Sequence, residues 1–257
     1  FIVLVAYYGL YIHAARAAAP GAARVALLAP LAVMFLFVAF LFTNNMSLML
    51  TPERWTAYFA TPDGTLLNAF LPGRAGDPTL WPRYLHFVTA SIAVGGLFMA
   101  FWQHRKAKRT QGEARARAEA AVRSGMDWFA WATLAQVLVG LWLYVSLPKA
   151  MLPLFMGKSA AHTVIFFAGF GGAITALLFG FKRLVVPAVW STLATVALMV
   201  AQRDLVRRDY LAPFFSPANL PVTNDYGPLV FFLASLALGV AGIIYVLRLA
   251  ARAGKEA

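Results

Sequence analysis

The sequence predicts an all-α protein that crosses a membrane several times. Its 257 residues are 61% hydrophobic and only 12% charged, with a mean hydropathy of +0.70. Soluble domains carry about 25% charged residues, so this composition excludes a soluble globular domain. The apolar residues form long runs separated by short polar segments, which is typical of membrane-spanning helices. We therefore expect a single transmembrane helical domain over residues 1–257.

Seven apolar runs predict seven transmembrane helices. They cover about 1–15, 25–44, 82–104, 127–147, 160–181, 184–203 and 228–250. The first run is short and opens on Phe1 rather than on methionine, so we expect further sequence before it. The third opens with Pro82, which the first turn of a helix tolerates because that N–H has no helical partner.

Two of the connections between these spans are long enough to predict structure of their own. Residues 105–123 are rich in Ala, Arg and Glu, which favours a helical extension beyond the third span. Residues 45–81 contain turn signals such as Pro62-Asp63-Gly64, and we expect them to form an ordered cap over one end of the bundle.

The basic residues predict which side of the membrane each connection faces. By the parity of the spans, four segments rich in Lys and Arg fall on one side, which the positive-inside rule makes cytoplasmic. They contain Arg16, Arg24, Arg105, Lys106, Lys108, Arg109, Arg115, Arg117, Arg123, Lys182, Arg183, Arg248, Arg252 and Lys255. Residue 1 is then outside and the C-terminus inside a bacterial-type cytoplasmic membrane. The net charge of +12 follows from this topology rather than from nucleic-acid binding.

One basic segment falls on the other side. Arg203, Arg207 and Arg208 lie outside by the same parity, and Asp204 and Asp209 neutralise them in part. Arginines that persist there are candidates for binding an anion such as a haem propionate. The alternative interpretation is a solvated helix end at the membrane surface.

The histidines are the candidate metal ligands. His86 and His104 are 18 residues apart on the third span, which places them on one helix face and roughly 27 Å apart. His162 opens the fifth span, which runs the same way as the third, so His86 and His162 lie at similar depth. Two opposed imidazoles on rigid helices are what a six-coordinate haem needs, and small residues follow both. The alternative is a hydrogen-bonded interfacial histidine with small residues that serve helix packing.

Other side chains are candidates for a second haem site or for a different ligand in the His86–His162 site. His13 and His104 form a second candidate haem pair near the cytoplasmic face, although Gln103-His104-Arg105-Lys106 also resembles an ordinary basic anchor. Arg83 is a further candidate partner for propionates. A methionine could replace one histidine, but most membrane methionines only pack; the candidates are Met46, Met49, Met151 and Met156. Because the chain has no cysteine, it cannot itself hold a thioether-linked haem, a cysteine-ligated iron–sulfur cluster or a disulfide.

Other classes of activity find no support in the sequence. There is no GxSxG, HExxH or Walker pattern that would indicate a hydrolase or an ATPase. Acidic residues are nearly absent from the spans, which argues against an ion-coupled pump or a proton relay through carboxylates.

The order of the motifs resembles a known family. One apolar helix ends in Thr43-Asn44-Asn45-Met46, and another opens with Trp81-Pro82-Arg83-Tyr84-Leu85-His86-Phe87. Ala201-Gln202-Arg203-Asp204-Leu205 ends the penultimate span. This order is similar to that of the large, haem-bearing subunit of cytochrome bd-type quinol oxidases. The resemblance implies a bd-oxidase-like helix bundle, with His86 in the place of a ligand to haem b.

The chain also departs from that family. Residues 163–167 lack the family's Met and Arg, the quinol-binding loop is reduced to about 148–159, and the family's Glu before the penultimate helix end is absent. The helices with the oxygen-site histidine would precede Phe1. The resemblance therefore implies electron transfer rather than oxygen reduction.

The expected function is that of a membrane b-type cytochrome subunit in a respiratory complex. It would contain one haem b or two, and pass electrons between the quinone pool and an outer c-type cytochrome, together with other membrane subunits. Aromatic residues suggest a quinone site near the outer loops, although interfacial belts look the same: Trp81, Tyr84, Trp142 and Tyr144. The alternatives are a haem-free scaffold subunit and, in another class, a small-solute transporter or channel.

Overall fold

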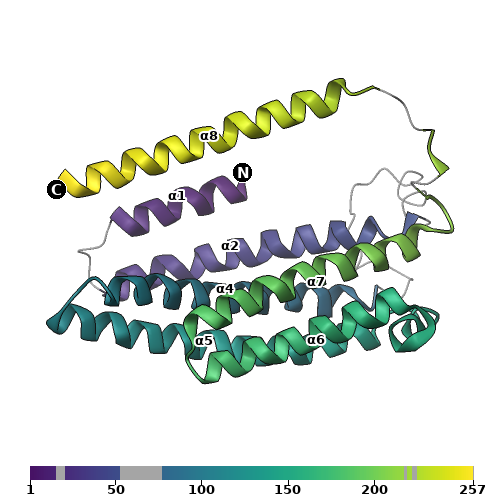
Figure 1. Cartoon of the computed structure of the whole chain (residues 1–257), viewed down its shortest axis with the longest axis horizontal. Coiled ribbons are helices and arrows are strands. Elements are labelled where there is room, and N and C mark those ends of the chain that lie inside the picture. Colours follow the sequence, from purple (N-terminus) through teal and green to yellow (C-terminus); the bar gives the residue numbers. More distant parts are fainter. Residues whose placement is uncertain (16–20, 53–76, 217–218, 222–224, 257) are drawn as a thin grey trace. The chain divides into compact units, whose positions relative to one another are not determined.

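The computed structural model describes residues 1–15, 21–52, 77–216, 219–221 and 225–256, and its regular elements in these ranges are helices. Most of the predicted cap, residues 53–76, lies outside them, as does Arg16; the side chains of Arg24, Arg252 and Lys255 are also not described. The helices (Figure 1) are α1 (Ile2–Ala15), α2 (Gly21–Leu48), α4 (Leu80–Ala107), α5 (Gly112–Val145), η1 (Leu154–Lys158), α6 (Ala160–Phe181), α7 (Val185–Leu211) and α8 (Gly227–Glu256).

Six of these helices are long and apolar enough to cross a membrane, which supports a multi-pass membrane protein. They are Val25–Leu48, Leu80–Ala107, Gly112–Val145, Ala160–Phe181, Val185–Leu211 and Gly227–Leu249. The first predicted span corresponds to α1, which has only 14 residues. At 1.5 Å per residue it covers about 21 Å, less than the roughly 30 Å of a bilayer's hydrocarbon core.

The chain divides into two compact units, Phe1–Phe215 and Ser216–Ala257. The second unit contains the apolar helix α8. In the first unit, successive long helices run antiparallel (Figure 1). Helix α4 packs along α5, and α6 along α7; α5 also contacts α6, and α4 contacts both α7 and α2. Helix α1 packs on α2. The prediction of a single domain over residues 1–257 stays a prediction.

Small residues bring the helices of this first unit close together. A Cβ atom on Gly96 of α4 would lie 2.8 Å from the carbonyl oxygen of Gly125 of α5, so the two backbones are in direct contact. Between α6 and α7, Ser191 Oγ donates a hydrogen bond to the Gly172 carbonyl at 3.1 Å. The buried apolar core follows the same helices: Ala93, Leu97, Ala100, Met126, Phe129, Ala132, Ala176, Val185 and Ala188. Close approach through small residues is typical of membrane helices.

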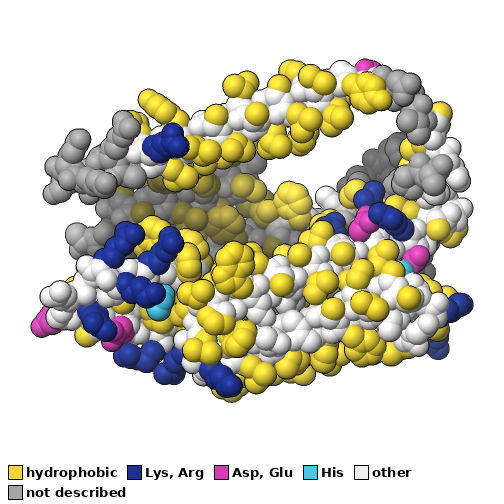
Figure 2. Space-filling model, in the orientation of Figure 1, with side chains coloured by type: hydrophobic (Ala, Val, Ile, Leu, Met, Phe, Trp, Pro, Cys, Tyr) yellow, Lys and Arg dark blue, Asp and Glu magenta, His cyan; other side chains and the backbone are white. Residues whose placement is uncertain are grey.

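The outer surface of the helices is apolar, as expected for contact with lipid. Phe98, Trp102, Trp128 and Trp131 are each more than 60% exposed. Figure 2 shows hydrophobic side chains over the middle of the helices and Lys and Arg side chains gathered toward their ends. An apolar belt with basic ends is the pattern of a protein that spans a bilayer.

The helix expected over residues 105–123 is present only in part as an extension of the third span, since most of this segment begins the next helix. Helix α4 continues to Ala107 and α5 begins at Gly112, so only residues 108–111 are not helical. On α5, Arg115 pairs with Glu119 and Arg117 with Glu113, four residues apart in each case. We call the end of the first unit where α4 is followed by α5 the basic end.

A half-exposed ion pair ties the α6–α7 turn to α5. Arg183 Nη2 lies 3.0 and 3.3 Å from the two carboxylate oxygens of Asp127. Both side chains are about half exposed, and exposed pairs contribute about 0–1 kcal/mol. We expect Asp127→Asn to change the apparent melting temperature of the purified protein only slightly. A loss of several degrees would instead show that the lipid places this pair in a low-dielectric environment.

Candidate functional site

His86 lies inside the helix bundle with an unused ring nitrogen. It is in the second turn of α4 and half-buried. Its ring packs against α5 at Gly140, where an added Cβ atom would come 3.4 Å from His86 Cε1. Its Nδ1 atom is buried and, among the described residues, has no hydrogen-bond partner. Buried polar atoms usually have a partner, so this nitrogen is a candidate to bind a ligand.

A cavity of about 150 Å³ lies beside His86, between α5, α6 and α7. Its walls are mainly apolar, and three polar side chains face it: His86, Gln136 and Gln202. Gln136 Oε1 accepts a hydrogen bond from Thr89 Oγ1. Both amide atoms of Gln202 are buried and lack a partner in the described part of the chain. An apolar cavity with a few convergent polar groups is the usual form of a ligand site.

Sequence reasoning missed several residues of this cavity. Met199 and Gln202 lie three residues apart on α7, and both line it together with His86. Their helical spacing placed them on one face of the span, but nothing in the sequence indicated that this face turns toward α4. The four methionines that the sequence offered as candidate ligands do not line the cavity: Met46, Met49, Met151 and Met156.

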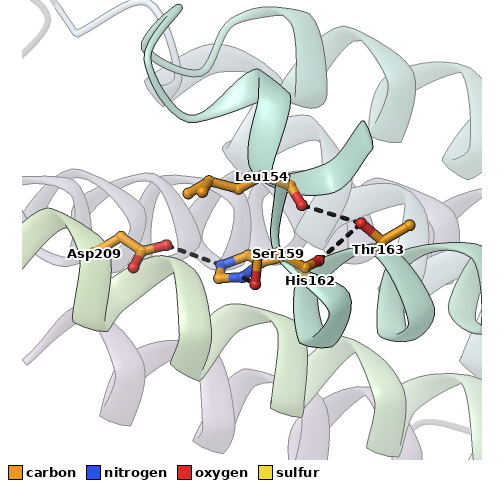
Figure 3. A network of polar contacts seen from close by, with 5 residues as sticks. All are labelled: Leu154, Ser159, His162, Thr163 and Asp209. Carbon is orange, nitrogen blue, oxygen red and sulfur yellow. Dashed lines mark hydrogen bonds and ion pairs between the residues drawn. The ribbon is translucent and has the colours of Figure 1, made fainter. Parts of the chain in front are cut away.

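His162 is buried in a polar network at the same end of the bundle (Figure 3). Its Nε2 atom lies 2.8 Å from Asp209 Oδ2 on α7, and its Nδ1 atom lies 3.0 Å from Ser159 Oγ. Thr163 Oγ1 donates to the carbonyl of Leu154, 3.1 Å away in η1. The network therefore joins η1, α6 and α7. Both ring nitrogens of His162 have polar neighbours, and its side chain does not line the cavity beside His86.

The four aromatic residues predicted for a quinone site fall into separate groups. Tyr144 packs against Phe155 and Phe166, and Phe155 lies edge-on to the ring of His162 with their centroids 5.5 Å apart. Trp81 and Tyr84 instead pack against Phe40 of α2, where the Tyr84 hydroxyl donates to the Leu36 carbonyl. Trp142 is exposed. These contacts place the four residues on two different helix pairs, α5–α6 and α2–α4.

The predicted arginines lie toward the ends of α4 and α7, and none of them lines the His86 cavity. Arg83 is half-buried and donates from Nη2 to Thr79 Oγ1 at 3.1 Å; it lies within electrostatic range of the Asp77 carboxylate as well as of Arg203. Arg208 pairs with Asp204 at 2.5 Å. Arg203 and Arg207 are exposed, and no described acidic side chain lies within ion-pair distance of them. Arg203 directly follows Gln202 of the cavity in the sequence.

The structure does not join His13 to His104. His13 is in the last turn of α1 and is half-buried. His104 is also half-buried and lines a different cavity at the basic end, formed by α4 and α5. Within the described residues no contact links the two imidazoles, so a second haem between them stays a prediction.

The fold and this site define a multi-pass membrane protein with a polar, partly unsatisfied cavity inside its helix bundle. Comparisons with protein-family models, with curated proteins and with solved structures found no match. The resemblance to the large subunit of bd-type quinol oxidases therefore stays a prediction from the motifs alone.

Proposed function

We propose that the chain is a b-type cytochrome subunit of a membrane electron-transfer complex, in which His86 binds the haem iron. The observation that supports this most is the buried, unpartnered Nδ1 of His86 beside an apolar cavity. Histidine is a usual axial ligand of haem, and helix bundles form cofactor sites between facing helices. Haem supplies one-electron chemistry, while the protein supplies binding, orientation and electrostatics.

The residues around the cavity suggest how the chain would hold this group. Met199 lines the same cavity as His86, so it would be a better candidate than His162 for a second residue holding the group. His162 would first have to release Asp209 or Ser159. Arg83 and Arg203 would be the candidates to neutralise propionates, with Arg207 and, once it releases Asp204, Arg208 from the surface. Three small residues, Gly140, Gly169 and Ala173, line the cavity and leave space that larger side chains would fill.

The size of the cavity sets a requirement on this proposal. Sites for small molecules usually have about 300–1,000 Å³, more than the roughly 150 Å³ beside His86. The large side chains Phe166 and Phe170 both line it. Binding of a porphyrin therefore requires these two side chains to move away from His86.

The rest of the proposed assignment follows from the sequence. Helix α1 would complete seven spans, with residue 1 outside and the basic end facing the cytoplasm of a bacterial-type cell. Electrons would pass between the quinone pool and an outer c-type cytochrome, within a complex of several membrane subunits. A haem-free scaffold is the outcome if no haem is bound.

Replacing the ligand with glycine and restoring it with free imidazole tests the role of His86. We expect His86→Gly to lose the b-type α-band from the reduced-minus-oxidised spectrum, because the iron loses its axial nitrogen. Added imidazole should occupy the vacated space and restore the band in part. The matched control is Ser91→Ala on the same helix, whose hydroxyl only bonds to the Phe87 carbonyl. An unchanged band in His86→Gly would contradict the proposal.

A second candidate ligand is favoured by the size of the cavity. A quinone headgroup is smaller than a porphyrin, flat and apolar, and has two carbonyl oxygens that accept hydrogen bonds. The Gln202 amide has no partner of its own in the described residues, and it lines this cavity together with His86. If the purified protein lacks haem, we expect it to bind a short-chain ubiquinone analogue. Gln202→Leu should then weaken binding about tenfold, the effect of removing a hydrogen bond of roughly 1.4 kcal/mol. Equal binding by both proteins would exclude this role.

A further inference from the structure

The basic end contains a second cavity that is unrelated to the proposed cofactor site. It measures about 700 Å³ and lies where α4 ends and α5 begins. Its charged and titratable lining consists of His104, Lys108, Arg109, Arg115, Glu119 and Arg123. These side chains come from both sides of the turn at residues 108–111, so the cavity depends on the α4–α5 hairpin rather than on one helix.

The charge of this cavity is strongly unbalanced. Arg115 Nε lies 2.8 Å from the carboxylate of Glu119, so this arginine is already neutralised. Lys108, Arg109 and Arg123 are exposed and have no carboxylate within ion-pair distance among the described residues. Three cations therefore face one cavity with no acidic partner from the described chain, and repulsion between them favours a bound anion.

The turn itself is ordered by backbone hydrogen bonds. The Lys108 N–H donates to the His104 carbonyl at 3.3 Å, and the Arg109 N–H donates to the Lys106 carbonyl at 2.9 Å. Gly112 adopts φ +57°, a left-handed conformation that lets the chain reverse into α5. The basic side chains thus project from a fixed hairpin, which lowers the entropy lost when they bind a ligand.

Exposed aromatic side chains lie at the same level of α4 as the cavity but on another face of the helix, because residues two positions apart are about 200° apart around its axis. Trp102 is two residues before His104 and 61% exposed, and it stacks on Phe98, which is 65% exposed. Exposed tryptophan marks the boundary between the hydrocarbon core and the headgroups. Basic pockets at this depth suit lipid headgroups that carry phosphate.

We propose that the cavity at the α4–α5 turn binds the phosphate of an anionic phospholipid headgroup through Lys108, Arg109 and Arg123. This site is independent of whether the chain binds haem, because it shares no lining residue with the cavity beside His86.

Lipid binding to two matched triple variants tests this site. The first is Lys108→Gln/Arg109→Gln/Arg123→Gln; the control, Arg105→Gln/Lys106→Gln/Arg117→Gln, removes three charges from the same region but none that lines the cavity. Purified proteins are titrated with phosphatidylglycerol in detergent and the bound lipid is counted by native mass spectrometry. Each basic residue near an anionic headgroup contributes about fivefold, so the first variant should bind about a hundredfold more weakly.

Two controls complete the test. The control variant detects non-specific attraction by charge, and inorganic phosphate detects a site for a soluble ligand. We expect the control to bind phosphatidylglycerol within about threefold of the wild type, since its charges lie outside the cavity. Equal losses in both variants would mean that only the summed charge attracts the lipid, and would overturn the site. Inorganic phosphate should not displace the lipid at millimolar concentration. Displacement that requires Lys108, Arg109 and Arg123 would assign the cavity to a soluble phosphate compound instead of a lipid.

Discussion

Replacing Gly96 with alanine is expected to destabilise the α4–α5 pair, whereas the same change at the neighbouring Gly95 is not. An added Cβ atom at Gly96 would lie 2.8 Å from the Gly125 carbonyl oxygen and 2.9 Å from the Phe129 backbone nitrogen. Because both are backbone atoms, neither can rotate away and the two helices must separate. Overpacking of this kind costs about 1–3 kcal/mol, and separation would also expose the core around Phe129.

Gly95 provides the matched control for this experiment. It lies one residue earlier on α4, and a Cβ atom there would meet nothing within 4 Å. Gly95→Ala should leave stability unchanged or raise it by up to about 1 kcal/mol, because alanine favours the helix. Thermal unfolding of the two variants in the same detergent measures the difference. Equal stability of Gly95→Ala and Gly96→Ala would show that the helices do not meet at Gly96 and Gly125.

Removing the His162 side chain is expected to lower stability without moving the proposed haem band. His162 is 5% exposed, packs against Phe155 and contacts both Asp209 and Ser159. His162→Ala leaves a cavity and removes the only polar neighbour described for the Asp209 carboxylate, which together cost about 2–4 kcal/mol. The position of the α-band should not change, because His162 does not line the cavity beside His86.

A double-mutant cycle separates the polar contact from the packing. His162→Phe, Asp209→Asn and their combination should give a coupling of about 1–3 kcal/mol in unfolding. Asp204→Asn, on the same helix, is the control, because its pair with Arg208 is largely exposed and should contribute little. A shifted or lost α-band in His162→Ala would instead make His162 an iron ligand, as its position at the start of the fifth span predicts.

Most of the fold could be predicted from hydropathy, but hydropathy alone did not give the ends of the helices. The predicted span 82–104 and the predicted span 127–147 are longer in the structure, as α4 and α5. Basic residues end an apolar run, yet Arg, Lys and Ala continue a helix well, so α4 and α5 extend past the membrane-like sequence. In the same way α7 extends from the predicted residue 203 to Leu211 through a segment of alternating charge.

The candidate site was predictable only where one helix determines it. The position of His86 on an apolar helix marked it from the sequence alone. Asp209, the neighbour of His162, lies 47 residues further along the chain on another helix, and only the packing of α6 against α7 brings the two together. Met199 and Gln202 were missed for the same reason, since sequence spacing gives the face of a helix but not its rotation toward a neighbour.

The most direct test of the proposed function is a reduced-minus-oxidised visible spectrum of the purified wild-type protein, combined with a pyridine haemochromogen assay. It should be made on the protein isolated with its partner subunits, so that loss of cofactor during purification is not mistaken for absence. We predict a b-type α-band and about one haem per chain, at His86, because no contact in the described residues links the second candidate pair, His13 and His104. A well-folded preparation without haem would contradict the cytochrome assignment and leave a scaffold or a quinone-binding subunit.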